Sequence, residues 1–185
     1  MIFFDLDEPS TEKVPSQSPA KLSVLSSLRW ISIDGSPLDL HLMNEILISS
    51  PSLSMLIINM KYFLQLLQLR DEQSCLTLLQ TRIKHLSIQL SDEDDLHDRH
   101  IERLSQVFSN VRHLIVEHKI SDVDIEESLV RFCRSFENHQ LISMIIRGRT
   151  TEQLRLQPSQ WLIDRTNIRR PFQVECDLIE FKIWL

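Results

Sequence analysis

Two histidines hold the same place in two similar apolar segments of the chain. They are His85 in residues 83–88 (IKHLSI) and His113 in residues 111–116 (VRHLIV). Imidazole nitrogens bind metal ions and take up protons near neutral pH. A zinc site needs three or four ligands, and the pattern supplies no third ligand beside this pair. We therefore expect two exposed imidazoles, with no metal and no cofactor.

Other residues that could form a calcium site, a phosphate-binding loop or a catalytic nucleophile lack the spacing that such sites need. The acidic run at residues 92–95 (DEDD) lacks the glycine and the spacing of a calcium loop, and is typical of the start of a helix, where the helix dipole favours negative charge. Two glycines in the whole chain cannot build a phosphate-binding loop. No nucleophile motif is recognisable. We therefore expect that the protein is not an enzyme and has no catalytic residue.

The histidine segments belong to a set of five look-alike segments. The others are residues 28–33 (LRWISI), 53–58 (LSMLII) and 141–146 (LISMII), so the segments begin at positions 28, 53, 83, 111 and 141. A recurrence every 25–30 residues indicates stacked units of one strand and one helix. We expect an α/β fold, a short solenoid with a curved parallel sheet on its concave face and helices on its convex face.

The residues between the segments fit this scheme. Apolar periodicity predicts helices over residues 38–47, 62–80, 94–108, 121–136 and 151–164. The last should be broken or bent near Pro158, with Trp161, Leu162 and Ile163 packed inward. Alternating residues at 172–176 and 179–185 predict a strand pair that caps the sheet. Residues 1–20 are typical of a flexible leader, so the repeat domain should cover residues 21–185.

Strand alternation predicts which side chains leave the core. Successive side chains point to opposite faces, and parallel strands lie about 4.8 Å apart, so equivalent residues form columns across the sheet. The first outward column should hold Trp30, Met55, His85, His113 and Ser143. The second should hold Ser32, Ile57, Ser87, Ile115 and Ile145. The third should hold Asp34, Asn59, Gln89, Glu117 and Arg147.

Composition indicates which kinds of partner the protein binds and in which cellular compartment it works. A net charge of −6 argues against nucleic-acid binding. The three cysteines are far apart and predict core thiols in a reducing compartment. The most apolar stretch, residues 53–69, is too short and too polar to cross a bilayer. We expect a cytoplasmic or nuclear protein with no membrane association, monomeric unless the chain is a piece of a longer one.

The repeated L-x-x-[LIM]-x-[LIV] strand followed by a helix resembles leucine-rich-repeat proteins. Residues 50–56 (SPSLSML) and 108–114 (FSNVRHL) are similar to the repeat joints of F-box leucine-rich-repeat proteins, which have ribonuclease-inhibitor-like units. The resemblance implies a protein-binding module, the substrate-recognition part of a ubiquitin-ligase adaptor. Residues 1–20 are too short to hold an F-box.

Several residues of the outward columns are more apolar than a solvated face needs, and aromatic and Met residues are typical of interface centres. The partner-binding residues should be Trp30, Ser32, Met55, Ile57, His85, Ser87, His113, Ile115, Glu117, Ile145 and Arg147. Two alternatives stay open. One is a self-associating scaffold whose inner face is buried in an oligomer. The other is a doubly wound α/β enzyme, which also alternates strands and helices.

Overall fold

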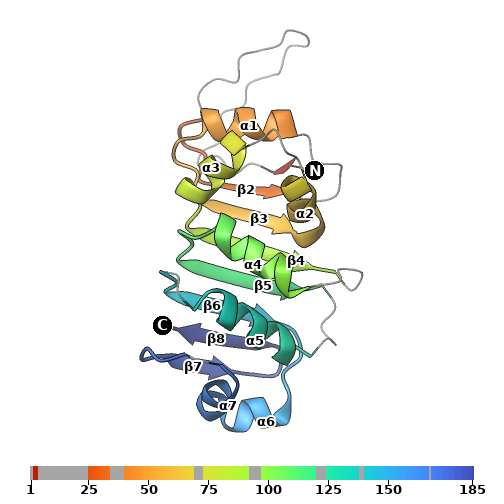
Figure 1. Ribbon diagram of the computed structural model, residues 1–185, viewed down its shortest axis with the longest axis vertical. Helices are drawn as coiled ribbons and strands as arrows, with labels where there is room; N and C mark the ends of the chain where they lie inside the picture. Colours follow the sequence, from red (N-terminus) through yellow and green to blue (C-terminus); the bar gives the residue numbers. More distant parts are fainter. Residues whose placement is uncertain are drawn as a thin grey trace, which may run out of the picture.

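Five parallel strands lie side by side in chain order and form most of one eight-stranded sheet (Figure 1). The computed structural model describes residues 2–3, 25–33, 40–68, 73–91, 97–119, 124–137, 140–166 and 168–185. The parallel strands are β2 (Trp30–Ile33), β3 (Met55–Asn59), β4 (His85–Leu90), β5 (His113–His118) and β6 (Ser143–Arg147). Each begins within one of the five repeated segments, so the sequence periodicity correctly located every parallel strand of the described sheet.

Antiparallel strands flank the parallel block on both sides. The short strand β1 (Ile2–Phe3) pairs with β2, and its two residues are the described part of the predicted leader. At the other end, β7 (Gln173–Cys176) and β8 (Glu180–Trp184) pair with each other, and β8 pairs with β6. The predicted C-terminal strand pair is therefore confirmed, and its second strand, β8, lies between β6 and β7.

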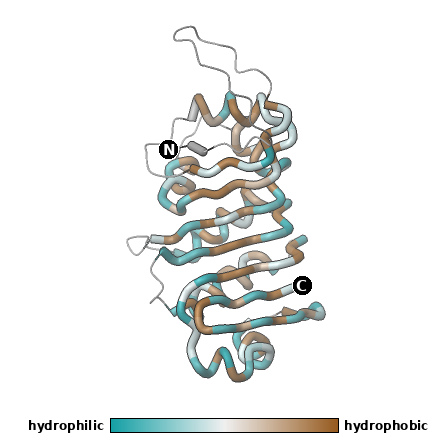
Figure 2. The backbone as a smooth tube through the Cα atoms, turned by 180° about the vertical axis from the view of Figure 1, so that it is seen from behind, coloured by the Kyte–Doolittle hydropathy of each residue, from teal (hydrophilic) through white to brown (hydrophobic). Residues whose placement is uncertain are grey.

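The helices lie over one face of the sheet. They are α1 (Leu40–Ser49), α2 (Met60–Gln68), α3 (Gln73–Arg82), α4 (Asp98–Val107), α5 (Glu126–Ser135), α6 (Glu152–Leu156) and α7 (Pro158–Arg165). In Figure 1, α2 to α5 stand in front of the strands, α1 lies at the β2 end of the sheet, and α6 and α7 lie at the β7 end. Seen from behind in Figure 2, the strands face the viewer and no described helix crosses them.

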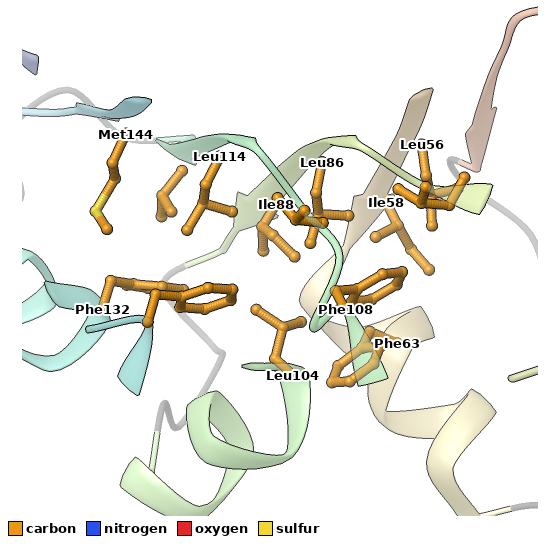
Figure 3. Packing of buried hydrophobic residues seen from close by; sticks show 14 of the residues in the cluster. Leu56, Ile58, Phe63, Leu86, Ile88, Leu104, Phe108, Leu114, Phe132 and Met144 are labelled. Carbon is orange, nitrogen blue, oxygen red and sulfur yellow. The ribbon is translucent and has the colours of Figure 1, made fainter. Parts of the chain in front are cut away.

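The core fills the space between these two layers. Figure 3 shows strand residues such as Leu86 and Leu114 pointing toward the helix residues Leu104, Phe108 and Phe132. All five are fully or almost fully buried, as are the corresponding positions on the other parallel strands. Phe63 of α2 and Phe108 after α4 bring their ring centroids to 5.8 Å, which ties one unit to the next.

Two helix predictions need correction. The pattern over residues 62–80 predicted one long helix, whereas the structure has two helices in this range, α2 (Met60–Gln68) and α3 (Gln73–Arg82), and residues 69–72 lie outside the described residues. Apolar periodicity alone did not separate the two helices. The predicted break at Pro158 is confirmed, since Pro158 opens α7. Trp161 and Leu162 are buried there as predicted, but Ile163 is 51% exposed, so its inward placement was wrong.

The order of the sheet distinguishes it from a doubly wound fold. A doubly wound sheet carries helices on both faces and reverses its strand order, and ligands bind in the crevice at that reversal. Strands β2 to β6 follow one another without reversal. The described sheet therefore lacks the switch-point crevice that the enzyme alternative requires.

Candidate functional site

The face of the sheet opposite the helices, called the open face here, carries its side chains in continuous rows. Because strand side chains alternate, the residues between the buried positions lie on this face. The predicted columns are confirmed by the strand register. The first row consists of Trp30, Met55, His85, His113, Ser143 and Trp184, each paired with the next across neighbouring strands.

The second row is the most aliphatic part of the open face. It consists of Ser32, Ile57, Ser87, Ile115, Ile145, Lys182 and Glu175. Ile57, Ile115 and Ile145 are half-buried. Ser87 lies between Ile57 and Ile115 and is only 5% exposed, so it contributes little surface to a partner. The row therefore offers three isoleucines, of which Ile115 and Ile145 are adjacent, flanked by polar side chains.

The third row is polar and carries charge at one end. It consists of Asn59, Gln89, Glu117, Arg147 and Glu180. Asp34, which the sequence places at its start, lies outside the described residues. Asn59 is buried and its Oδ1 accepts a hydrogen bond from the backbone N–H of Lys61, 2.9 Å away. Asn59 thus closes the turn into α2 and is not available to a partner.

The two histidines of the first row stack on each other. Their ring centroids are 4.5 Å apart and their planes differ by 13°. The Nδ1 of His113 lies 2.9 Å from the Oγ of Ser143, which fixes the orientation of that ring. Burial lowers the pKa of His85, and the nearby charges of His113 and Lys84 lower it further. The imidazole of His85 is therefore held in its neutral form near neutral pH.

No metal-binding cluster accompanies this histidine pair in the described part of the chain. No group of three or more His, Cys, Asp or Glu side chains is placed there to hold a metal ion. The predicted acidic helix start at residues 92–95 lies outside the described ranges. All three cysteines are free, and burial raises the pKa of Cys133 to about 12. That thiol therefore stays protonated and is a poor nucleophile.

The charged end of the third row is an ion-pair network across three strands. The Nε of Arg147 donates to Oε2 of Glu180 at 2.8 Å, and its Nη1 donates to Oε1 of Glu117. Lys182 reaches Oε1 of Glu180 at 2.6 Å. Burial alone would raise the pKa of Glu180, but the hydrogen bonds and charges of Arg147 and Lys182 outweigh it and lower that pKa. These four side chains satisfy one another's charges at the carboxyl ends of the strands.

The first row extends further than the sequence indicated. Trp184 of β8 pairs with Ser143 and is 38% exposed, and Gln173 of β7 pairs with Trp184, so the row continues onto both C-terminal strands. Glu180 and Lys182 join the third and second rows from the same strand. The alternation of residues 179–185 carried a signal for these positions. Strand β8 is antiparallel and lies outside the five repeated segments, however. Aligning the repeats therefore could not predict which residue of β6 each residue of β8 pairs with.

A cavity of about 270 Å³ lies away from the open face, beside the end of α5. It is lined by Phe136, Leu141, Met144, Ile168 and Arg170, together with Cys133, Glu137, Arg169 and Leu185. None of the predicted site residues contributes to this cavity. The open face therefore remains the place where those residues gather.

Two further observations concern the protein as a whole. None of the described helices combines the length and the apolar character needed to cross a membrane. A comparison with protein-family models gives no match, and a comparison with curated proteins gives none either.

Proposed function

We propose that this chain is a protein-binding module of the leucine-rich-repeat kind, and that its open face is the concave binding surface of a short solenoid. The supporting observation is the pair of aromatic and aliphatic rows, in register over six strands, which no described helix covers. Apolar side chains gathered on one uncovered face of a sheet are typical of a binding surface. Tryptophan is among the residues that anchor protein interfaces, and methionine is enriched in them.

The family resemblance adds a biological context to this proposal. The module would recognise a substrate for ubiquitin ligation, as the repeat region of an F-box adaptor does. The residues that carry binding would be those of the first and second rows, with Glu117 and Arg147 at the rim. Of the predicted set, Ser87 would contribute least because it is nearly covered.

Site-specific photo-crosslinking tests the open face directly. A photoreactive residue in place of Ile57 or Ile115 should capture the same partner protein in cells. The matched control carries the probe at Glu102, which is exposed on α4 in the helix layer, and should not capture it. Adding Ile145→Asp to the variant with the photoreactive residue at position 57 or 115 should abolish capture without unfolding the chain.

The outcomes separate protein binding from self-association. Capture of a second copy of this chain, together with a stable dimer in sedimentation, would support the scaffold alternative in place of partner binding. Equal capture from Glu102 and from the open-face positions would contradict the proposal. Loss of capture in Ile145→Asp with a normal melting temperature assigns the contact to the second row.

A further inference from the structure

Three basic side chains border the first row at the amino ends of the strands. Arg29 precedes Trp30, Lys84 precedes His85, and Arg112 precedes His113. The hydrogen-bond ladder continues through them, because the N–H of Ser54 donates to the carbonyl of Arg29 at 3.0 Å and that of Lys84 donates to the carbonyl of Ser54 at 2.8 Å. The N–H of Arg112 then donates to the carbonyl of Lys84, also at 2.8 Å. We call Arg29, Lys84 and Arg112 the basic edge.

The basic edge has no counter-charge among the described residues. All three side chains are exposed and none makes a salt bridge with a described residue. Lys84 and Arg112 directly precede the adjacent strands β4 and β5, which lie about 4.8 Å apart, and like charges at such a spacing repel each other. The charge of Lys84 is also felt at the neighbouring ring, where it helps to lower the pKa of His85. Positive charge thus accumulates along this border.

The opposite border of the open face differs in charge. There Glu117, Arg147, Glu180 and Lys182 neutralise one another. The open face therefore has unpaired cations on one side, the tryptophan, methionine and isoleucine side chains of the first and second rows in the middle, and a satisfied network on the other side. This asymmetry favours one charge and one orientation of a partner.

We propose that the open face binds an acidic amphipathic segment of a protein partner, whose carboxylates contact the basic edge and whose apolar side chains lie on the first and second rows. This inference rests on the proposed protein-binding function and specifies its ligand. An α-helix repeats its side chains about every 5.4 Å, close to the strand spacing of about 4.8 Å. A helix lying across the strands would therefore place one turn on each strand, as in helix-in-groove recognition.

The same cations could suggest single-stranded nucleic acid, but other residues of the face disfavour it. Nucleic-acid platforms stack bases on exposed aromatic rings. Here His85 and His113 stack on each other, and the second row presents Ile57, Ile115 and Ile145 in place of rings. The exposed basic side chains number only three along this border, in a chain of net charge −6. Nucleic acid is therefore an outcome of the test and not the proposal.

Fluorescent peptide probes of five helical turns, about 18 residues, test the ligand class with the full chain. The first probe carries leucine on one face and glutamate on the flank; the second has lysine in place of each glutamate. The third is polyglutamate of the same length, and a labelled oligothymidylate is the nucleic-acid probe. Anisotropy titrations should show saturable binding of the first probe, weaker binding of polyglutamate, and no binding of the other two.

Charge reversal locates the contact. The triple variant Arg29→Glu, Lys84→Glu, Arg112→Glu should weaken binding of the first probe by about tenfold or more, and the affinity of the unchanged protein should fall with added salt. The matched control reverses Lys61, Arg99 and Arg103, three exposed cations of α2 and α4, and changes the net charge equally. The control should leave the affinity unchanged.

Each remaining outcome counts against the inference. No binding of the first probe, equal loss in both triple variants, or preference for the lysine peptide or the oligonucleotide overturns it. The crosslinking result at Ile57 and Ile115 is independent of these titrations. If the chain captured a partner through Ile57 or Ile115 but did not bind the acidic peptide, the proposed type of ligand would be wrong. The proposed protein-binding function would still stand.

Discussion

The stacked pair of His85 and His113 makes the open face sensitive to acid. Burial, His113 and Lys84 all lower the pKa of His85 below its ordinary value of 6.5. The folded state therefore favours neutral His85 more than the unfolded state does. The stability that depends on the neutral ring is present above the unfolded pKa and is lost as the pH falls through the folded pKa.

We expect that His113→Gln raises the pKa of His85, because it removes the electrostatic contribution of His113 that helps to lower this pKa. Lys84→Gln should act in the same direction with a smaller effect. An NMR titration of the His85 ring protons measures both shifts, and Arg99→Gln on α4 serves as the control for a change of net charge. A pKa of His85 that stays unchanged in His113→Gln would contradict the coupling of the stacked rings.

Neighbouring residues of one strand should respond oppositely to the same substitution. Leu114 is 1% exposed and faces the helices, whereas Ile115 is half-buried on the open face. Leu114→Asp buries an unpaired charge and should cost several kcal/mol, enough to unfold the chain. Ile115→Asp should leave the melting temperature nearly unchanged.

The contrast is checked by thermal denaturation followed by circular dichroism. Ile33→Asp and Ser32→Arg repeat the comparison on β2, where Ile33 is buried and Ser32 lies in the second row. Similar melting of the inward and outward variants would contradict the assignment of the two faces.

At the scale of elements, the C-terminal strand pair depends on a few buried side chains. Phe181 and Ile183 of β8 are fully buried, and the intervening Lys182 lies on the open face. Phe181→Ala should lower the free energy of unfolding by about 3–5 kcal/mol, because it removes a large core side chain and leaves a cavity. Lys182→Ala removes a solvent-screened ion pair and should change the free energy of unfolding far less than Phe181→Ala does.

Urea denaturation measures both variants, and the linear extrapolation gives the difference in unfolding free energy. If Phe181→Ala were as mild as Lys182→Ala, β8 would not be part of the common core. The same pair of variants therefore tests whether the strand pair is integral to the sheet or merely attached to its edge.

The elements that the sequence predicted well are those with a repeated pattern. Register across β2 to β6 followed from aligning the L-x-x-L-x-L segments, because equivalent residues in equivalent units face each other. Positions without such a pattern were missed. The separation of α2 from α3 was not predicted, and Ile163 is exposed although its helix neighbours Trp161 and Leu162 are buried.

The residues of the open face show the same contrast between positions in the repeat, which were predicted, and positions outside it, which were missed. The pairing of His85 with His113 was visible in the repeat, but Trp184 required the register of an antiparallel strand. The sequence did not predict that Arg29, Lys84 and Arg112 form a common border, because each is the only basic residue at its position within its own segment. Only the sheet brings them onto one border, where their lack of counter-charges becomes a property of the surface.

At the scale of the whole molecule, contacts run mainly between neighbours in the chain order. Strands β2 to β5 each pair only with the strand before and the strand after them in the chain, β6 pairs with β5 and β8, and the sheet is not closed. Stability in such an arrangement is close to a sum of unit stabilities and nearest-neighbour terms. Damage at one end should therefore open that end first, while distant units stay folded.

Hydrogen-exchange mass spectrometry of two core variants tests this locality. Phe181→Ala should speed exchange in β6, β8 and β7 more than in β3, whereas Leu56→Ala, which removes a fully buried side chain of β3, should do the reverse. The difference arises because each variant weakens only the neighbour contacts of its own unit. If both variants raised exchange equally in β3 and β8, the sheet would unfold as one cooperative block, and the description of the chain as a row of separately stabilised units would be wrong.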